Sequence, residues 1–256
     1  MNSPRRNRLV EYVNKVGFAS VEELSDALGV SMQTIRRDVR LLSDNNLITR
    51  YHGGAARLSG EESKENKNTD YKIRLGQHVS EKQVIARLLA ERIEDNSSVF
   101  LAIGTTMEAV AYELRTKKGL TVFTNSLKVA NILHEETDFD VIIPGGTVQK
   151  RNGGLVNSET EDFIKRIRVD YLLFSVGGMD DSGYLLDYYM SEVNIARMMM
   201  ERSSNSFLAI DSGKLNKRAP IEVGSLKNIN ALFVDATPPT GIASLAKEHG
   251  VEVIKP

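Results

Sequence analysis

The sequence from Ser20 to Ala56 constrains the fold more strongly than any other part of the chain. It reads SVEELSDALGVSMQTIRRDVRLLSDNN and continues as LITRYHGGAA. Ser20 and Glu23 have the spacing of a capping box at the start of a helix, and Gly29 permits a sharp turn after it. A basic helix and a small basic hairpin follow. This order predicts a winged helix-turn-helix, in which one helix enters the DNA major groove.

Apolar residues at helical spacing support this assignment. The pattern predicts a first helix over residues 5–16. Ile35, Val39 and Leu42 give the last helix of the motif an apolar face that can dock on the helices before it. The remaining expected elements are strands over residues 47–51 and 55–58, joined by a turn at Gly53 and Gly54.

The other face of that last helix is basic and polar, as a helix that reads DNA requires. A bidentate arginine on guanine is the commonest specific base contact, and Arg36 and Arg37 can grip either a base or a phosphate. We expect the neighbouring Asp38 to orient an arginine rather than touch DNA. A helical interaction module with a solvated arginine face is the alternative. The predicted DNA-binding residues are Ser31, Gln33, Thr34, Arg36, Arg37 and Arg40 on the helix and Arg50, His52 and Arg57 in the wing.

The length and the charge distribution fit two domains. A chain of 256 residues is long for one domain and comfortable for two. Residues 59–69, SGEESKENKNT, have no aliphatic side chain that could join a core, so we predict a linker there between domains of residues 1–58 and 70–256. Residues 1–58 hold 9 Lys and Arg against 6 Asp and Glu, a modest surplus that suits a polyanion.

Composition excludes several other classes of protein. The chain has no cysteine, which excludes a disulfide framework and a cysteine-ligated metal, and its 4 histidines are scattered without ligand spacing. We therefore predict no metal and no cofactor. No apolar run reaches the roughly 18 residues that span a bilayer, and the first residues lack the apolar segment of a secretory signal. The expectation is a cytoplasmic protein without a membrane partner.

From about residue 70 the pattern changes to helices that alternate with apolar strands. Continuous apolar strands separated by helices are typical of a parallel sheet that helices cover on both faces. We therefore predict an α/β fold in which a doubly wound domain follows the winged helix-turn-helix. The expected strands lie within residues 99–103, 120–124, 139–144, 170–176, 206–210, 231–236 and 251–254.

The turn after the first of these strands has the features of an anion site. Gly104 is followed by Thr105 and Thr106, whose hydroxyls add donors to the free backbone N–H groups of a helix start. Thr105 and Glu108 have the spacing of a capping box. A phosphate cradle is the functional interpretation, and a plain tight turn is the alternative.

Small polar or glycine-rich loops follow several other strands. Ligands of open parallel sheets bind beyond the carboxyl ends of the strands, so these loops favour one shared small-molecule site. Asp180 and Glu192 can accept hydrogen bonds from sugar hydroxyls, although Asp180 can equally be a turn residue. Lys150 and Arg151 are interpreted as surface charges. The predicted effector-binding residues are Gly104, Thr105, Thr106, Asn125, Ser126, Gly145, Gly146, Gly177, Gly178, Asp180, Glu192 and Lys214.

The segment SVEELSDALGVSMQTIRRDVRLL followed by RYHGGA resembles the DNA-binding signature of the DeoR family of bacterial repressors. The motifs IGTT, TNSLKVA, PGG, SVGG and DSGK follow in the family's order, so the resemblance covers nearly the entire chain. It implies a sensor domain similar in fold to ribose-5-phosphate isomerase and a sugar-phosphate effector that lowers affinity for operator DNA. Paired reading heads raise specificity, so we expect a homodimer or homotetramer.

Ala102 departs from the family's pattern. Many relatives have an acidic residue two positions before the glycine of IGTT, where this chain has Ala102. The difference weakens any transfer of sugar-hydroxyl contacts and favours a different effector, phosphorylated or sulfonated, from that of the commonest members. The chain resembles most the subgroups that control glycerol-3-phosphate and sulfoquinovose catabolism, of which the second also lacks the acidic residue.

Two functional hypotheses follow from the sequence. The leading one is an effector-responsive transcriptional regulator, most simply a repressor of a carbohydrate-catabolism operon. Whether such a regulator represses or activates depends on the position of its operator, which the amino-acid sequence does not contain. The alternative is a sugar-phosphate isomerase-like enzyme with an appended DNA-binding domain, in which Asp180, Glu192 and Lys214 supply acid–base chemistry.

Overall fold

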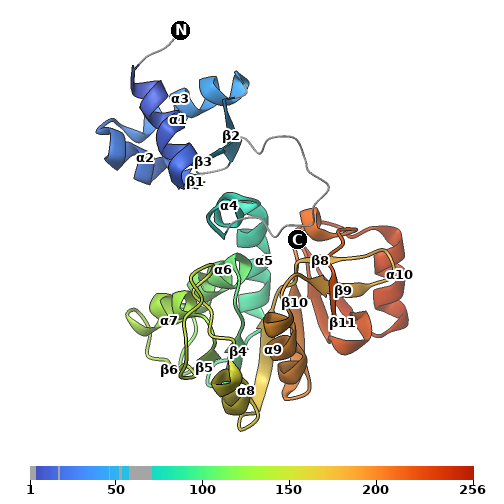
Figure 1. Ribbon diagram of the computed structural model, residues 1–256. Coiled ribbons are helices and arrows are strands. Elements are labelled where there is room, and N and C mark those ends of the chain that lie inside the picture. The colour runs from blue at the N-terminus through green and yellow to red at the C-terminus, as the bar shows by residue number, and fades with distance from the viewer. Residues whose placement is uncertain (1–3, 17, 46, 52–53, 58–70) are drawn as a thin grey trace. The chain divides into compact units, whose positions relative to one another are not determined.

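The computed structural model describes residues 4–16, 18–45, 47–51, 54–57 and 71–256. The chain divides into two compact units, Met1–Ser80 and Glu81–Pro256 (Figure 1). Gly53 of the predicted Gly53–Gly54 turn and the predicted linker at 59–69 lie outside the described residues. In the part of the chain that the structure describes, no helix is long and apolar enough to cross a membrane.

The first unit combines helices with a small antiparallel sheet (Figure 1). Its described elements are α1 (Pro4–Val16), β1 (Phe18–Ser20), α2 (Val21–Leu28), α3 (Met32–Asp44), β2 (Ile48–Tyr51), β3 (Gly54–Arg57) and α4 (Tyr71–Gly76). The strands pair in the order β1-β3-β2, and α4 lies against β1 and β3. The helix-turn-helix with its wing is confirmed.

Local hydrogen bonds explain where α2 and α3 begin. The N–H of Glu23 donates to Oγ of Ser20 at 3.0 Å, and the N–H of Ser20 donates to Oε2 of Glu23 at 2.9 Å, which confirms the capping box. Gly29 ends α2 with φ of +64°, a left-handed conformation that glycine adopts at little cost. Ser31 then caps α3, because its Oγ accepts from the N–H of Thr34 at 3.4 Å.

An apolar core holds the first unit together. Ile35, Val39 and Leu42 of α3 are buried, as predicted, against Leu9 and Val13 of α1. Strand β1 is an element that the sequence pattern does not predict. Its 3 residues are too few for alternation to show, and only pairing with β3 defines it as a strand.

The second unit is built on a seven-stranded sheet in the order β13-β12-β10-β7-β4-β5-β6. Each of these strands overlaps a predicted apolar segment, although β10 begins three residues before its segment. They are β4 (Ser98–Leu101), β5 (Thr121–Thr124), β6 (Asp140–Ile142), β7 (Val169–Phe174), β10 (Ser203–Ala209), β12 (Ala231–Phe233) and β13 (Glu252–Ile254). All neighbouring pairs are parallel, which confirms the predicted α/β class.

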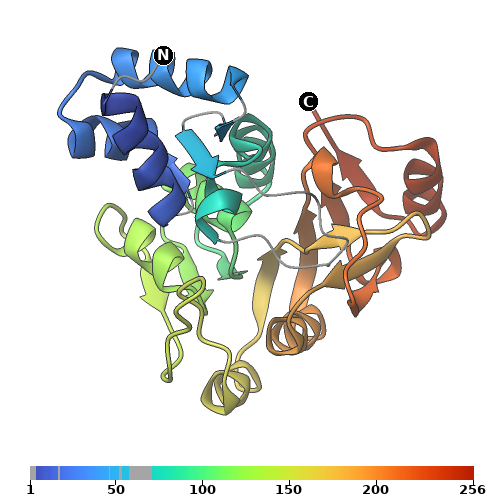
Figure 2. The same cartoon turned by 45° about the horizontal axis from the view of Figure 1, so that its top comes forward.

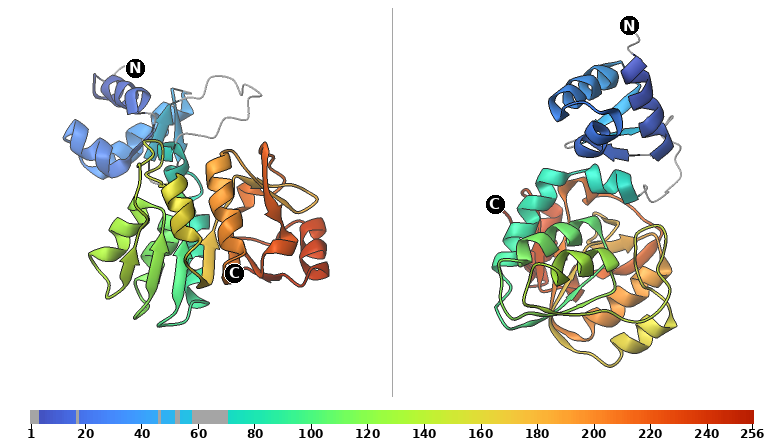
Figure 3. Two further views of the ribbon diagram at one scale, coloured as in Figure 1. Left: turned by 60° about the horizontal axis from the view of Figure 1, so that its bottom comes forward. Right: turned by 90° about the vertical axis from the view of Figure 1, so that its left-hand side faces the viewer.

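Helices cover both faces of this sheet, as further views show (Figures 2 and 3). On one face lie α5 (Val79–Glu91), α6 (Thr105–Leu114) and α7 (Leu127–His134), and on the other lie α8 (Ser158–Ile164), α9 (Met190–Met200) and α10 (Thr240–Glu248). Side chains alternate along a strand, so Val99 and Leu101 of β4 enter the first core and Phe100 enters the second. The apolar runs of the sequence reflect this burial on both sides.

A second, antiparallel sheet of this unit is not predicted by the sequence pattern. It consists of β8 (Gly178–Met179), β9 (Tyr184–Asp187) and β11 (Ile221–Ser225) in the order β11-β9-β8. Strand β8 has only 2 residues, and the pairing of β11 shifts register between Glu222 and Gly224. No regular alternation therefore marks these strands in the sequence.

The large sheet changes its direction of growth between β4 and β7. The chain adds β5 and β6 on one side of β4 and then returns to add β7, β10, β12 and β13 on the other side. Asp170 of β7 joins the two strands at their amino ends, because its Oδ2 accepts from the N–H of Ser98 at 2.8 Å and from the Ser98 hydroxyl at 2.6 Å. These hydrogen bonds hold the pKa of Asp170 below its ordinary value. At the opposite edge lie the carboxyl ends of β4 and β7, the position beyond which ligands of such sheets bind.

Replacing Asp170 by Asn should lower the free energy of unfolding at neutral pH by about 1 kcal/mol, because an exposed carboxylate with two donors is replaced by a weaker acceptor. The folded pKa is depressed, so this stabilisation is present above the unfolded pKa of about 3.9 and is lost as pH falls through the lower folded pKa. Urea titrations of both proteins at neutral pH and at about pH 2.5 measure the difference. A difference of the same size at both pH values would contradict the role of the carboxylate.

Candidate functional sites

The exposed face of α3 carries most of the predicted DNA contacts. Gln33, Arg36, Arg37 and Arg40 are exposed, on the side of the helix away from its buried apolar face. The helix therefore presents three guanidinium groups and one amide to solvent. Of the predicted wing residues, Arg50 on β2 is exposed, Arg57 is the last residue of β3, and His52 lies outside the described residues.

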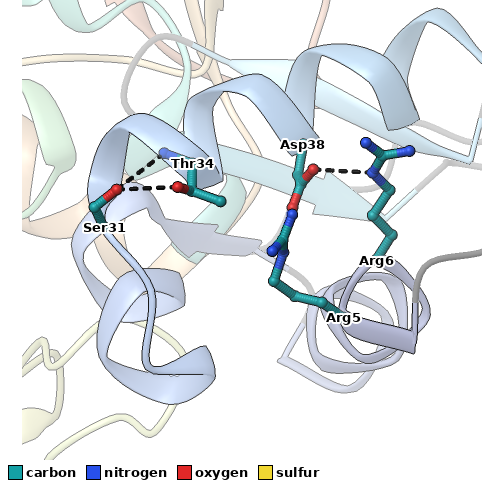
Figure 4. A network of polar contacts seen from close by, with 5 residues as sticks. All are labelled: Arg5, Arg6, Ser31, Thr34 and Asp38. Carbon is teal, nitrogen blue, oxygen red and sulfur yellow. Dashed lines mark hydrogen bonds and ion pairs between the residues drawn. The ribbon is translucent and has the colours of Figure 1, made fainter.

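Ser31 and Thr34 meet at the start of α3. Besides the capping bond, their hydroxyl oxygens lie 3.0 Å apart, within hydrogen-bond distance (Figure 4). Backbone N–H groups and hydroxyls at a helix N-terminus are frequent phosphate contacts in protein–DNA complexes. Capping is a structural role that is compatible with this, and DNA contact by these two residues stays a prediction.

Asp38 is buried, with 1% of its side chain exposed, and its carboxylate binds two arginines of α1. Nε of Arg5 donates to Oδ2 at 2.7 Å, and Nε of Arg6 donates to Oδ1 at 2.9 Å (Figure 4). Burial raises the pKa of Asp38, but the hydrogen bonds and charges of the two arginines outweigh burial and hold the pKa below its ordinary value. The prediction that Asp38 orients an arginine is confirmed.

The two arginines that bind Asp38 are residues that sequence reasoning missed. The available signal was the position of Asp38, which follows Ile35 by three residues and precedes Leu42 by four, in phase with the buried face of α3. A carboxylate in that phase requires a cationic partner, since an unpaired buried charge is strongly destabilising. The sequence does not reveal that the partners are Arg5 and Arg6, because only helix packing brings α1 to α3.

In the second unit, the turn between β4 and α6 has the geometry of an anion site. Gly104 has φ of +148°, a backbone conformation that other residues rarely adopt, and a Cβ added there would meet nothing within 4 Å. No side chain caps the start of α6. The expected capping box of Thr105 and Glu108 is therefore wrong, because Gly104 takes the cap position, one residue earlier than that spacing assumes. The uncapped first N–H groups of α6 suit an anion better than a capped helix would.

Thr106 carries the clearest polar signal at this turn. The residue is 1% exposed, and among the described residues its Oγ1 has no hydrogen-bond partner. Buried hydroxyls are almost always hydrogen-bonded in folded proteins, so an exception indicates a functional group. The neighbouring Thr105 is also buried. The turn that follows Gly104 therefore contains a buried hydroxyl donor, that of Thr106.

The two predicted residues in the loop after β5 have different contacts. Ser126 caps α7, because its Oγ accepts from the N–H of Val129 at 3.3 Å. Asn125 donates through Nδ2 to the carbonyl of Leu155 at 3.1 Å, while its buried Oδ1 has no partner among the described residues. Asn125 therefore keeps an acceptor at the carboxyl end of β5, next to β4 in the sheet.

Lys214 reaches the loop after β7 from the short helix that follows β10. Its Nζ donates to Oγ of Ser175 at 3.1 Å and to the carbonyl of Val176 at 3.0 Å, and it lies 3.9 Å from Oδ2 of Asp211. Asp211 is 1% exposed, and neither of its carboxylate oxygens accepts a hydrogen bond from the described residues. Sequence reasoning missed Asp211, although it is the first residue of the DSGK motif. Four neighbouring strands, β10, β7, β4 and β5, thus bring polar groups to one edge.

Glu192 is bound by two neighbours through Oε1, and its contact with an effector stays a prediction. It forms an ion pair with Arg151 and accepts from Nδ2 of Asn152 at 3.0 Å. Arg151, interpreted as a surface charge, is partly exposed and also makes structural contacts: its guanidinium carbon lies 3.5 Å from the ring centroid of Tyr189, and its Nε is buried. Its neighbour Lys150 is exposed, as expected. In this region Arg151 therefore joins α9 to the segment that follows β6.

Asp180 is a turn residue, which is one of the two roles that its sequence allows. Its Oδ1 accepts from the N–H of Ser182 at 3.1 Å and of Tyr184 at 2.9 Å, in the connection between β8 and β9. Both bonds stabilise a local turn. In the described part of the chain, no group of His, Cys, Asp and Glu residues could hold a metal ion.

The remaining predicted glycines follow two strands of the large sheet. Gly145 and Gly146 come after β6, the edge strand, and Gly177 and Gly178 come after β7 at the change of direction. A Cβ at Gly178 would lie 2.3 Å from the carbonyl oxygen of Lys217, so close packing alone requires glycine there. Their binding of an effector stays a prediction.

Comparison with known families agrees with this geometry. The DeoR-like helix-turn-helix domain matches residues 5–61, and the DeoR C-terminal sensor domain matches residues 77–236. The chain belongs to the DeoR family. The two matched domains coincide with the winged helix-turn-helix and with most of the parallel α/β unit, and they confirm the resemblance seen in the sequence motifs.

Relatives within the DeoR family match the chain almost from end to end. The HTH-type transcriptional repressor CsqR of Escherichia coli (strain K12) is 37% identical over 99% of this chain and 95% of its own length. The glycerol-3-phosphate regulon repressor of the same organism is 38% identical over 97% of both chains. Among solved structures, ribose 5-phosphate isomerase A from Methanocaldococcus jannaschii is similar with a TM-score of 0.41 and 10% identity, over 54% of this chain and 55% of that chain.

Because the hydroxyl of Thr106 is unpaired, removing it should not lower the free energy of unfolding. Thr106→Val should leave the free energy of unfolding unchanged or raise it by about 1 kcal/mol, because it removes a buried group without a partner. Thr124→Val is the matched control, since Oγ1 of Thr124 donates to the carbonyl of Leu101 at 2.6 Å and accepts from the N–H of Ser126 at 3.1 Å. The control should lose about 1–3 kcal/mol in urea titrations. A comparable loss in both variants would show that the Thr106 hydroxyl is paired within the protein.

Proposed function

We propose that this DeoR-family protein represses a carbohydrate-catabolism operon and leaves its operator DNA when a small phosphorylated or sulfonated sugar metabolite binds the second unit. It acts as a cytoplasmic homodimer or homotetramer, without a cofactor and without a membrane partner. The observation that carries the effector half of the proposal is the buried, unpaired hydroxyl of Thr106 at the uncapped start of α6.

A phosphate or sulfonate group suits the donors at this turn. The first N–H groups of a helix have no acceptor within the helix, and the helix dipole adds about 0.3–1 kcal/mol of attraction for an anion. Each hydrogen bond to a charged oxygen adds about 1.5–3 kcal/mol. Phosphate and sulfonate groups both offer several oxygens to converging donors, so this turn does not distinguish between them.

Acceptors at the neighbouring strand ends support a polyhydroxylated body for the same ligand. Oδ1 of Asn125 and the carboxylate of Asp211 are buried acceptors without hydrogen-bond donors among the described residues. Sugar hydroxyls are donors that would satisfy them, and buried acceptors reject analogues that lack such donors. Donors at β4 and acceptors at β5 and β10 together favour a sugar that carries one anionic group.

The contacts of the candidate acid–base residues favour regulation over catalysis. A general acid or base must lie within reach of the proton that it transfers. The carboxylate of Glu192 is bound by Arg151 and Asn152, and that of Asp180 holds a turn between two strands. We therefore propose that the sensor unit binds its ligand without turnover, which argues against the isomerase-like alternative.

The response to the effector follows from linkage between two binding equilibria. A ligand shifts DNA affinity only by its different affinities for the DNA-competent and DNA-incompetent states. The glycerol-3-phosphate regulon repressor and the transcriptional repressor CsqR, both of Escherichia coli, support repression as the output. Within an oligomer, two reading heads on one operator multiply this change in affinity.

Arg37→Ala tests the DNA-reading face. The variant should bind a duplex selected by the wild-type protein from random-sequence DNA about 5- to 100-fold more weakly, because one base or phosphate contact is lost. Electrophoretic mobility shift at several salt concentrations measures this, and Arg87→Ala, at an exposed arginine of the second unit, is the control for net charge. Equal affinity, sequence preference and salt slope in the variant and the wild type would remove Arg37 from the interface.

Thr106→Val tests the effector site separately from DNA binding. Screening by thermal shift with glycerol 3-phosphate, hexose phosphates and sulfosugar metabolites first identifies a ligand of the wild-type protein. The variant should bind that ligand about 10-fold more weakly, since one charge-assisted hydrogen bond is lost, and should bind ligand-free operator unchanged. The same ligand concentration for half-release of labelled operator in both proteins would exclude Thr106 from the site.

A further inference from the structure

The first turn of α1 holds two arginines where helix electrostatics disfavour them. Arg5 and Arg6 follow Pro4 at the start of the helix, and no acidic residue accompanies them in that turn. A cation near a helix N-terminus is disfavoured by about 0.3–1 kcal/mol. Asp38 on α3 offsets this by binding both (Figure 4). A purely structural link between α1 and α3 would need one ion pair, or an apolar contact of similar volume.

The contact with Asp38 occupies only part of each guanidinium group. Both hydrogen bonds come from Nε, the nitrogen nearest the main chain, and a guanidinium has five N–H donors in total. In the described part of the chain, Asp38 is the only partner of Arg5 or Arg6. Figure 4 shows the Asp38 carboxylate joined to Arg6 through Nε alone. The side chains remain 37% and 26% exposed, so a further acceptor can reach them.

These arginines border the face of α3 that carries the predicted DNA contacts. Asp38 follows Thr34 by four residues, which places both on one flank of the helix (Figure 4). The next residue on the exposed side is Arg37, about 100° around the helix from Asp38. Two positive charges against one negative charge leave the cluster with a net charge of about +1 at neutral pH.

We propose that Arg5 and Arg6 bind backbone phosphate of the DNA beside the groove that α3 enters, and that Asp38 is their positioning residue. The planar donor fork of arginine matches a phosphate in a way that lysine does not. Because Asp38 holds both side chains in place, less rotamer freedom is lost on binding. Such contacts set the register of α3 on the duplex and carry no base preference of their own. The inference deepens the proposed operator binding and rests on it.

The experiment compares two variants that change net charge equally. The triple variant R5Q/R6Q/D38N removes the cluster without leaving a buried unpaired carboxylate, and it lowers the net charge of the chain by one unit. R8Q also lowers it by one unit, at an exposed arginine of α1 that has no contact with Asp38. Mobility shift with the selected duplex and with a scrambled duplex, over a range of salt concentrations, gives affinity and salt slope for each protein.

The triple variant should bind both duplexes at least about 10-fold more weakly, and its salt slope should fall by about two units per bound chain. R8Q should change affinity and salt slope little. A triple variant whose affinity and slope match those of R8Q would overturn phosphate binding. If circular dichroism shows that the triple variant is unfolded, R6Q alone leaves Asp38 paired with Arg5. R6Q should lose about one unit of slope, and an unchanged slope overturns the proposal.

D38N alone tests the positioning role of Asp38. It adds one positive charge, so attraction to DNA by charge alone would tighten binding, whereas loss of positioning should weaken it about 3- to 10-fold. Tighter binding by D38N would overturn the role of Asp38. If the wild-type protein selects no duplex, the proposed function itself is contradicted. If the wild-type protein selects a duplex but the loss of Arg5 and Arg6 changes neither affinity nor salt slope, only this inference is contradicted.

Discussion

The parallel pairing of β4 with β7 is the contact on which the sensor unit depends. It is made where the sheet changes its direction of growth, and ligands of open parallel sheets bind beyond the carboxyl ends of the strands at such a position. The hydrogen bonds between Asp170 and Ser98 fix the same pair at the amino ends. Because β4 is buried on both faces and leads directly into α6, the uncapped N–H groups of that helix are held at the carboxyl edge of the sheet. The proposed anion site follows from this topology and from the glycine that permits the turn.

Buried polar groups in the two units differ in whether the chain satisfies them. In the first unit, Asp38 is fully enclosed and bound by two arginines, so its charge is compensated within the protein. In the second unit, the hydroxyl of Thr106 and the carboxylate oxygens of Asp211 accept no hydrogen bond from the described residues, and the hydroxyl of Thr106 donates none. The first pattern stabilises and orients, whereas the second stores unsatisfied hydrogen-bonding capacity that a ligand can use. This contrast separates the positioning network of the first unit from the proposed binding site of the second.

Membership of the DeoR family and the geometry support each other at different levels. The family assigns a DNA-binding role to the first domain and a sensor role to the second. The geometry supplies the physical means: an exposed arginine face on α3, an uncapped helix start at the edge of the sheet, and carboxylates at positions 180 and 192 that are engaged in local structure. In the proposed function, the buried acceptors of Asn125 and Asp211, which lie in the TNSLKVA and DSGK motifs, contribute to recognition of the sugar.

The sequence by itself determined the helix-turn-helix, the seven apolar strands, the Gly104 turn and the exposed arginines of α3, because capping, periodicity and glycine chemistry act over a few neighbouring residues. It also predicted that Asp38 orients an arginine. Only the tertiary structure decided that Arg5 and Arg6 are the partners, that Glu192 is bound by Arg151, that α6 lacks a cap and that Asp211 is buried beside Lys214. Strands β1 and β11 likewise exist only through pairing with distant segments, and β8 is too short for alternation to show. For the partners of Asp38 and Glu192 and for these strand pairings, the physical reason is that contacts between residues tens of positions apart leave no periodic trace in the sequence.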